Sequence, residues 1–180
     1  MVKMDSRLAR YVLGAAASAF LLVGSASAQL SSEGGPIRVN ADTSSVLERE
    51  RRVVVIGNVD IVQGDARLRA DQVTLFYSDR DGETGGGGIG GSFGDIERMT
   101  AVGDVFYVTP DLKARGDTGT YNATTDVITL TGEEVVLIRG EDVATGCELE
   151  LKVAEGRSNL KGCEGDGVRI LIMPEGTSEP

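Results

Sequence analysis

Two cysteines are the side chains best suited to covalent chemistry in this 180-residue chain, which contains no histidine. Without an imidazole, neither a Ser-His-Asp nor a Cys-His arrangement can form, and histidine-based metal sites are impossible. The 28 aspartates and glutamates still offer carboxylate pairs of the kind used in glycoside hydrolysis. None of them stands in a pattern that separates it from solvated strand faces and turns. We therefore expect a protein that is not an enzyme; a carbohydrate-active protein that uses two carboxylates is an alternative.

The two cysteines, Cys147 and Cys163, flank a predicted hairpin turn at residues 155–159. In an oxidising compartment a lone pair of cysteines favours a disulfide, and closing a loop of this size contributes roughly 3 kcal/mol in the chain-entropy model. Strand alternation places Cys147 on a face with Leu149 but Cys163 on a face with Lys161, and a bulge would bring the two cysteines to the same face. Two free buried thiols are the alternative.

A glycine-rich segment at residues 85–91 contains the spacing G-x-G-x-x-G. A dinucleotide site requires a helix directly after those glycines, whereas residues 96–108 are rich in strand formers. The acidic residues at 79–81 lack the full ligand series of a calcium loop. We interpret residues 82–94 as a flexible hairpin loop, and we expect neither a cofactor nor a metal.

The first 28 residues have the three parts of a secretory signal peptide. Three basic residues precede an apolar stretch at 11–23, and small residues at 26–28 form a cleavage site after Ala28. The apolar stretch is too short for a membrane anchor. No cysteine stands at the cleavage point, so lipid attachment is not expected. The chain is predicted to be exported into the periplasm as a soluble protein.

Length and charge limit what the remaining chain can be. We expect a flexible segment at 29–36, one domain at 37–173 and a disordered tail at 174–180. With 18 basic and 28 acidic residues, the formal net charge is −10. Because neutralising phosphates supplies most of the affinity for nucleic acids, a chain this acidic is not expected to bind them.

A short pattern recurs along the domain and predicts its fold class. Three sequence segments begin at Gly57, Gly103 and Gly132. Each predicts an alternating strand directly after the glycine, followed by turn residues and a second short strand. Such a unit cannot bury its apolar face alone, so neighbouring copies must stack. No helix is expected after the signal peptide. The sequence therefore predicts an all-β protein with one long shared interior.

The composition of that interior is compatible with two interpretations, a surface that binds acyl chains and a plain hydrophobic core. The chain has no tryptophan and few aromatic residues, and its apolar residues are mostly Val, Ile, Leu and Ala. Branched aliphatic side chains suit a surface that binds acyl chains, which need apolar area more than polar contacts. A plain aliphatic core is an equally good interpretation of composition alone.

Several phrases in a fixed order resemble the LptA family of periplasmic lipopolysaccharide-transport proteins, the OstA-like group. The resemblance covers roughly residues 37–172. The phrases lie at residues 57–64, 68–71, 96–105, 114–121 and 128–132. Each phrase is weak alone, whereas their order is specific for the group. Two features depart from the family pattern: the long insert at 82–94 and the pair of cysteines.

The resemblance implies an OstA-like, V-shaped β-jellyroll of many short antiparallel strands. It also implies a lipopolysaccharide carrier that shields lipid A acyl chains in an apolar groove. Candidate groove residues are Val39, Val55, Val59, Ile61, Leu68, Leu75, Leu130, Val135, Leu137, Leu149, Leu151, Ile170 and Ile172.

The resemblance also implies that the protein forms part of a transport bridge from the inner to the outer membrane. The implied partners are the jellyroll components of this bridge at the inner and outer membranes, and further copies of this chain in a head-to-tail homo-oligomer. Strand edges at 37–41 and 168–173 would accept a partner's strand. Arginines between Arg38 and Arg69 would lie near lipid phosphates or on solvated strand faces. The alternative function is a structural β-repeat domain that binds other proteins through its edges and holds no lipid.

Overall fold

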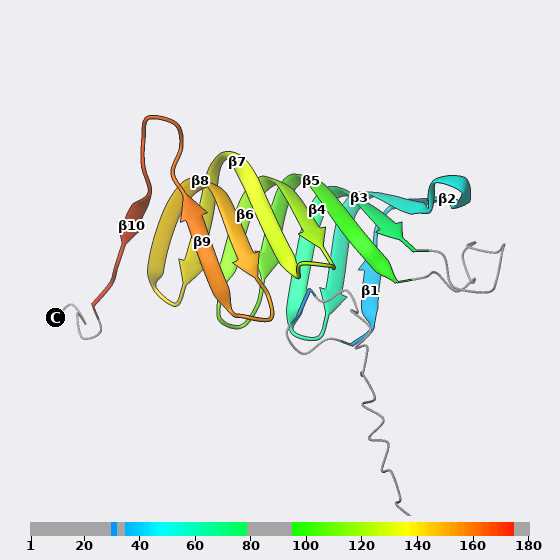
Figure 1. Cartoon of the computed structure of the whole chain (residues 1–180), viewed down its shortest axis with the longest axis horizontal. Coiled ribbons are helices and arrows are strands. Elements are labelled where there is room, and N and C mark those ends of the chain that lie inside the picture. Colours follow the sequence, from blue (N-terminus) through cyan, green and yellow to red (C-terminus); the bar gives the residue numbers. More distant parts are fainter. Residues whose placement is uncertain (1–29, 32–34, 79–94, 175–180) are drawn as a thin grey trace, which may run out of the picture.

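The computed structural model describes residues 30–31, 35–78 and 95–174. These residues form ten strands and one short 3-10 helix, η1 (Glu48–Glu50) (Figure 1). The predicted glycine-rich loop and signal peptide lie outside the described residues. The strands are β1 (Ile37–Asn40), β2 (Thr43–Leu47), β3 (Arg52–Gln63), β4 (Ala66–Tyr77), β5 (Ile96–Val108), β6 (Lys113–Asn122), β7 (Val127–Arg139), β8 (Asp142–Lys152), β9 (Arg157–Lys161) and β10 (Arg169–Leu171).

All ten strands belong to one antiparallel sheet, in the order β1-β3-β4-β5-β6-β7-β8-β10. At one end β1 and β2 pair with different parts of β3, and at the other end β9 and β10 pair with different parts of β8. Consecutive long strands are neighbours throughout, as expected for a meander. The all-β jellyroll predicted from the sequence is confirmed.

Each long strand passes through a bend that divides the sheet into two halves. The pairing registers shift at this level in β3–β4, β4–β5, β5–β6, β6–β7 and β7–β8, which marks a row of bulges. We name the two halves after β1 and β2. The β1 half comprises β1, 59–63, 66–70, 105–108, 113–116, 135–139, 142–145 and β10; the β2 half comprises β2, 52–56, 72–77, 96–102, 118–122, 127–131, 148–152 and β9.

Pairs of aspartate and glycine form the row of bends. A Cβ added to Gly103 would lie 2.8 Å from Cγ of Asp71, and one added to Gly132 would lie 2.7 Å from Oδ2 of Asp117. Such distances are sterically impossible without a shift, so only glycine lets the neighbouring carboxylate pack there. Asp117 Oδ2 also accepts a hydrogen bond from the backbone N–H of Glu133 at 2.9 Å. The carboxylate therefore satisfies a donor that the bulge leaves outside the sheet ladder.

The same arrangement begins the row, where Gly57 packs against Asp42. Both Gly57 and Gly103 have a φ of +83°. The repeated pattern places a glycine before each alternating segment, whereas the structure confirms strands over 52–62 and 96–108 that continue through these glycines. These glycines lie inside β3 and β5, where the strand crosses from one half to the other, because a bulge needs a positive φ as much as a turn does.

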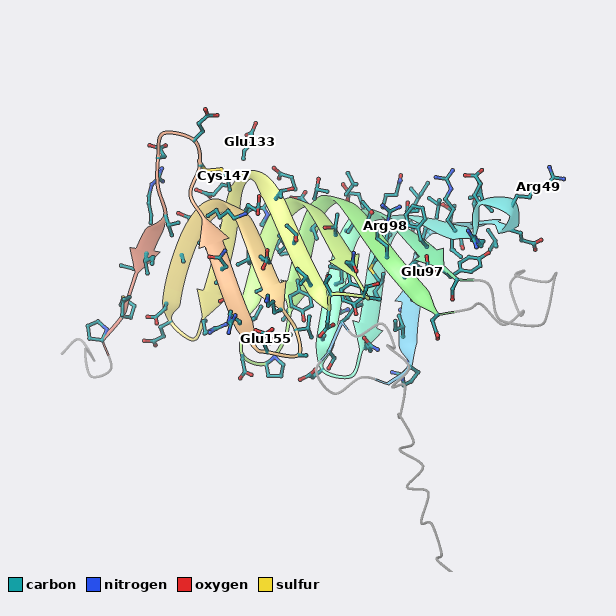
Figure 2. All side chains as sticks on the ribbon, in the orientation of Figure 1. Arg49, Glu97, Arg98, Glu133, Cys147 and Glu155 are labelled. Carbon is teal, nitrogen blue, oxygen red and sulfur yellow. A yellow bond between two sulfur atoms is a disulfide. The ribbon has the colours of Figure 1, made fainter. Side chains whose placement is uncertain are left out.

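The last bend lies at Gly146 in β8, where an added Cβ would approach the backbone carbonyl of Lys161, and the disulfide Cys147–Cys163 follows it directly. Its Cα atoms are 4.9 Å apart, which confirms the predicted pairing. Strand alternation predicts opposite faces for the two cysteines, but it does not apply to Cys163. The β8–β9 ladder ends at Glu148 and Lys161, and the chain leaves the strand before Cys163. Figure 2 shows Cys147 and Glu133 along the bent edge of the sheet, and Glu155 at the opposite edge.

The hydrophobic core lies between the inner faces of the two halves. Strand alternation directs Val53, Val55, Val59 and Ile61 of β3 inward, and all four are buried. Residues from both halves meet across this space: a Cβ on Gly119 would touch Leu130 and Val105. The interior is therefore one apolar layer that extends along the row of strands.

Candidate functional site

The apolar interior is the candidate site, and the structure brings most of the predicted groove residues to it. Leu137 is partly buried against this core. Nine others are buried in the core, and they come from β3, β4, β7 and β8: Val55, Val59, Ile61, Leu68, Leu75, Leu130, Val135, Leu149 and Leu151.

Three of the predicted groove residues lie at the two ends of the sheet instead. Val39 in β1 is 37% exposed, and Ile170 and Ile172 are 66% and 67% exposed at the other end. Ile170 belongs to β10, which forms the edge of the sheet next to β8. These three side chains contribute to exposed edges rather than to the interior.

The interior is filled with side chains in this structure. One void of about 10 Å³ lies between the halves, next to Leu68 in the β1 half and Met99, Tyr121 and Ile128 in the β2 half. This is about the space of one water molecule, and the lining is apolar. An acyl chain can therefore enter only if side chains move aside or the halves separate.

A cleft of about 670 Å³ opens on the side opposite the bends. The β5–β6 hairpin contributes Leu112, and the β7–β8 hairpin contributes Gly140. The other wall is the β8–β9 hairpin with Leu151 and Val153. Leu151 is also a core residue, so the cleft reaches the edge of the apolar interior.

Three basic residues line this cleft beside its apolar floor. Lys152 and Arg157 both pair with Glu155, at 3.5 and 3.2 Å, and Arg139 donates a hydrogen bond to Ser158 Oγ at 3.4 Å. All of these pairs are solvent-exposed, so each contributes little to stability. The three cationic side chains therefore lie at the solvent-exposed rim of an apolar opening.

The next part of the same opening is closed by Leu30, a residue that sequence reasoning did not single out. Its backbone N–H donates to Gln63 Oε1 at 2.5 Å, and its carbonyl accepts from Tyr107 Oη at 2.6 Å. Ser31 Oγ donates to Asp65 Oδ1 at 2.5 Å. No local sequence signal marks these contacts, because the hydrogen bonds join residues 33 to 77 positions apart.

Burial raises the pKa of the Tyr107 hydroxyl well above its ordinary value, and the nearby carboxylate of Asp65 adds to the effect. The neutral hydroxyl is therefore held as a hydrogen-bond donor to the Leu30 carbonyl. On the outer face of the β1 half, hydrogen bonds from Arg67 lower the pKa of Asp60, and Arg69 lies at 3.6 Å from the same carboxylate. These two arginines thus form part of a charged strand face.

Neither a metal site nor a membrane-spanning helix emerges from the described residues. No group of three or more potential ligands among Cys, Asp and Glu comes together there. Among the same residues, no helix is long and apolar enough to cross a membrane.

Taken together, a bent antiparallel sheet with an apolar layer between its halves defines the class of OstA-like β-jellyroll proteins. Residues 38–157 match the family described as "LptA/(LptD N-terminal domain) LPS transport protein". The chain belongs to this family of lipopolysaccharide-transport proteins.

Relatives and a solved structure agree with this assignment. An uncharacterised protein (R00383) of Rhizobium meliloti is 33% identical over 140 residues, which cover 78% of this chain and 72% of the relative. The LPS-assembly protein LptD of Yersinia enterocolitica is 32% identical over 90 residues, half of this chain but 10% of that protein. The crystal structure of LptH, the LptA homologue of Pseudomonas aeruginosa, matches 78% of this chain and 96% of its own with a TM-score of 0.63 at 23% identity, which supports the fold.

Proposed function

We propose that this protein is a periplasmic carrier that shields the acyl chains of lipid A between the two halves of its sheet. It would form one segment of a protein bridge that moves lipopolysaccharide from the inner to the outer membrane. The observation that carries the proposal is the apolar layer of aliphatic residues between the halves, whose edge at Leu151 borders an open cleft. Such a layer offers area to hydrocarbon chains and needs no covalent chemistry.

The membership in a lipopolysaccharide-transport family supports the substrate. The solved relative LptH is described as a periplasmic component of the lipopolysaccharide transport device, which supports the compartment. The predicted signal peptide, with cleavage after Ala28, agrees with export.

The bridge part of the proposal rests on the two open edges of the sheet. Exposed apolar residues gather at the C-terminal edge: Val168, Ile170, Leu171, Ile172 and Met173. At the other edge, β1 and β2 leave one side of their backbone unpaired with any strand in the described part of the chain. Strand addition at these edges would join the sheet to similar jellyrolls at either membrane, or to further copies of this chain.

Photo-crosslinking tests the lipid-binding part. A photoreactive residue at Leu112, which lines the cleft, or at Leu137, which is partly buried, should capture lipopolysaccharide in cells. Val102 is a matched control because it is aliphatic but exposed on β5, and it should capture none. Equal capture at all three positions, or capture at Val102 alone, would contradict the assignment of the interior.

A structural domain that holds no lipid is a second candidate, and the filled interior favours it. Side chains such as Ile61, Leu130 and Leu149 are fully buried there, and the void next to Leu30 holds only about 10 Å³. Gentle extraction of the exported protein, followed by mass spectrometry of bound lipid, separates the two functions. Lipid A that co-purifies in proportion to the protein excludes the structural role, whereas a lipid-free protein that still pulls down jellyroll partners supports it.

A further inference from the structure

Leu30 occupies the interior as a side chain from outside the sheet. It is 3% exposed and lines the same small void as Leu68, Met99 and Tyr121. No strand of the sheet contains it, and strand β1 begins only at Ile37. The core is therefore completed at this point by a segment that the sheet does not hold in place through its ladders.

Three side chains form a cradle for this segment. Gln63 accepts the N–H of Leu30, and Tyr107 donates to its carbonyl, so both polar groups of one peptide residue are bound by side chains. Asp65 accepts from Ser31. Gln63 is buried and uses its amide nitrogen to donate to the carbonyl of Gly35 at 3.0 Å. The cradle thus has the features of a built peptide-binding site: an apolar pocket for the side chain and polar groups for the backbone.

The position of the cradle makes it compete with a ligand. It lies in the opening opposite the bends, next to the cleft, and Asp65 and Tyr107 line both. The Leu30 side chain fills space between the halves, and the remaining void holds about one water molecule. An acyl chain and Leu30 cannot occupy this part of the interior together.

We propose that Leu30 and Ser31 form a resident plug that occupies the acyl-chain site and is displaced when lipid A enters. The inference rests on the function proposed above, since it names how that site is regulated. The plug keeps the apolar interior covered while no lipid is bound. It leaves when hydrocarbon of equal or greater area takes its place, and the polar cradle then becomes free at the opening.

The plug lowers the apparent affinity of the protein for lipid A, and the fraction of plugged protein determines by how much. If the lipid binds only the unplugged form, the measured dissociation constant is the intrinsic one divided by the unplugged fraction. A plug seated about 90% of the time weakens binding about tenfold. Truncating Leu30 removes its apolar contacts and should recover most of that factor.

The first measurement compares lipid A affinity among three variants of the exported protein. Leu30→Ala should bind hexaacylated lipid A about tenfold more tightly than the natural chain. Ser31→Ala loses the contact with Asp65 and should show a smaller gain. Val102→Ala removes aliphatic surface at an exposed position, so its affinity should stay within twofold of the natural chain.

The second measurement needs no variant except for resonance assignment. In the methyl-labelled natural protein, the Leu30 methyl groups should show cross-peaks to Met99 and Tyr121 that disappear as lipid A is added. If the natural chain binds lipid A while Leu30→Ala binds it equally well and these cross-peaks persist, the plug is refuted and the carrier function stands. If neither form binds lipid A, the carrier function fails, and the competition fails with it.

Discussion

Replacing Gly103 by alanine should destabilise the fold far more than an ordinary glycine substitution. Gly103 has a φ of +83°, and its Cβ would lie 2.8 Å from both Cβ and Cγ of Asp71. A non-glycine residue held at such a φ costs of order 1–3 kcal/mol, and overpacking costs typically 1–3 kcal/mol. We expect Gly103→Ala to lower the free energy of unfolding by about 3 kcal/mol.

The hairpin glycine Gly140 separates the two contributions. It has a φ of +61°, and no atom lies within 4 Å of the position that a Cβ would take. Gly140→Ala therefore tests backbone strain alone and should cost about 1 kcal/mol. The excess of about 2 kcal/mol at Gly103 is assigned to the contact with Asp71.

A double-mutant cycle tests that assignment directly. In an Asp71→Gly background the carboxylate is absent, so the cost of Gly103→Ala should fall to that of Gly140→Ala. Urea unfolding under non-reducing conditions, followed by far-UV circular dichroism and tyrosine emission, gives each free energy. An equal cost of Gly103→Ala in both backgrounds would refute the idea that the carboxylate is what demands glycine at the bends.

Three further predictions concern the disulfide and two titrating groups. Replacing Cys147 and Cys163 by alanine should cost roughly 3 kcal/mol and increase hydrogen exchange in β10, which pairs with β8 over only three residues. The pKa of Tyr107 is raised in the folded protein, so its contribution to stability is fully present below the unfolded value of about 10 and is lost above it. Alkaline unfolding of Tyr107→Phe should accordingly show a shallower pH dependence above pH 10, and an unchanged slope would contradict the buried hydroxyl. The pKa of Asp60 is lowered by Arg67, so its contribution is present above the unfolded value of about 3.9 and is lost as the pH falls through the folded value. Acid titration of Asp60→Asn should show a weaker loss of stability below pH 4, and a profile identical to the natural chain would count against this ion pair.

The strands could be predicted from the sequence because alternation of apolar and polar residues depends only on neighbouring positions. Period-two alternation over residues 52–62 places Val53, Val55, Val59 and Ile61 on one face, and all four are buried. The two cysteines were paired correctly because hairpin chemistry brings neighbouring strand ends together. Alternation depends on residues within a few positions of one another, and the disulfide joins residues 16 positions apart across a single predicted hairpin.

The bends and the ends of the sheet could not be predicted in the same way. Gly57 lies inside the strand that alternation predicts at residues 52–62, but a glycine with a positive φ occurs both in turns and in bulges, so the sequence does not identify the bulge there. The expected edges at 37–41 and 168–173 do form the two ends of the sheet, as β1 and β10, but alternation alone also marks Val39 and Ile170 as groove residues because it does not distinguish an edge strand from a central one. Edge position depends on strand order, which is a property of the whole sheet.

The cradle for Leu30 was missed for a different reason. Its partners Gln63 and Tyr107 lie 33 and 77 residues away, so only the assembled sheet brings them together. Neither a capping motif nor an alternating pattern precedes Leu30 in the sequence. A short segment next to an expected cleavage site carries no local sign that it will be buried.

The interrupted edges of this sheet affect how selectively it can join another one. At each end the bend splits the edge into two short strands, β1 and β2 at one end and β9 and β10 at the other, with three to five residues each. A flat strand can reach only one of these pieces and gains few hydrogen bonds. A partner with the same bend reaches both, and the second contact then forms at a high effective concentration. Bivalent pairing of this kind rewards a matching shape, and it discourages the indiscriminate strand addition that leads to aggregates.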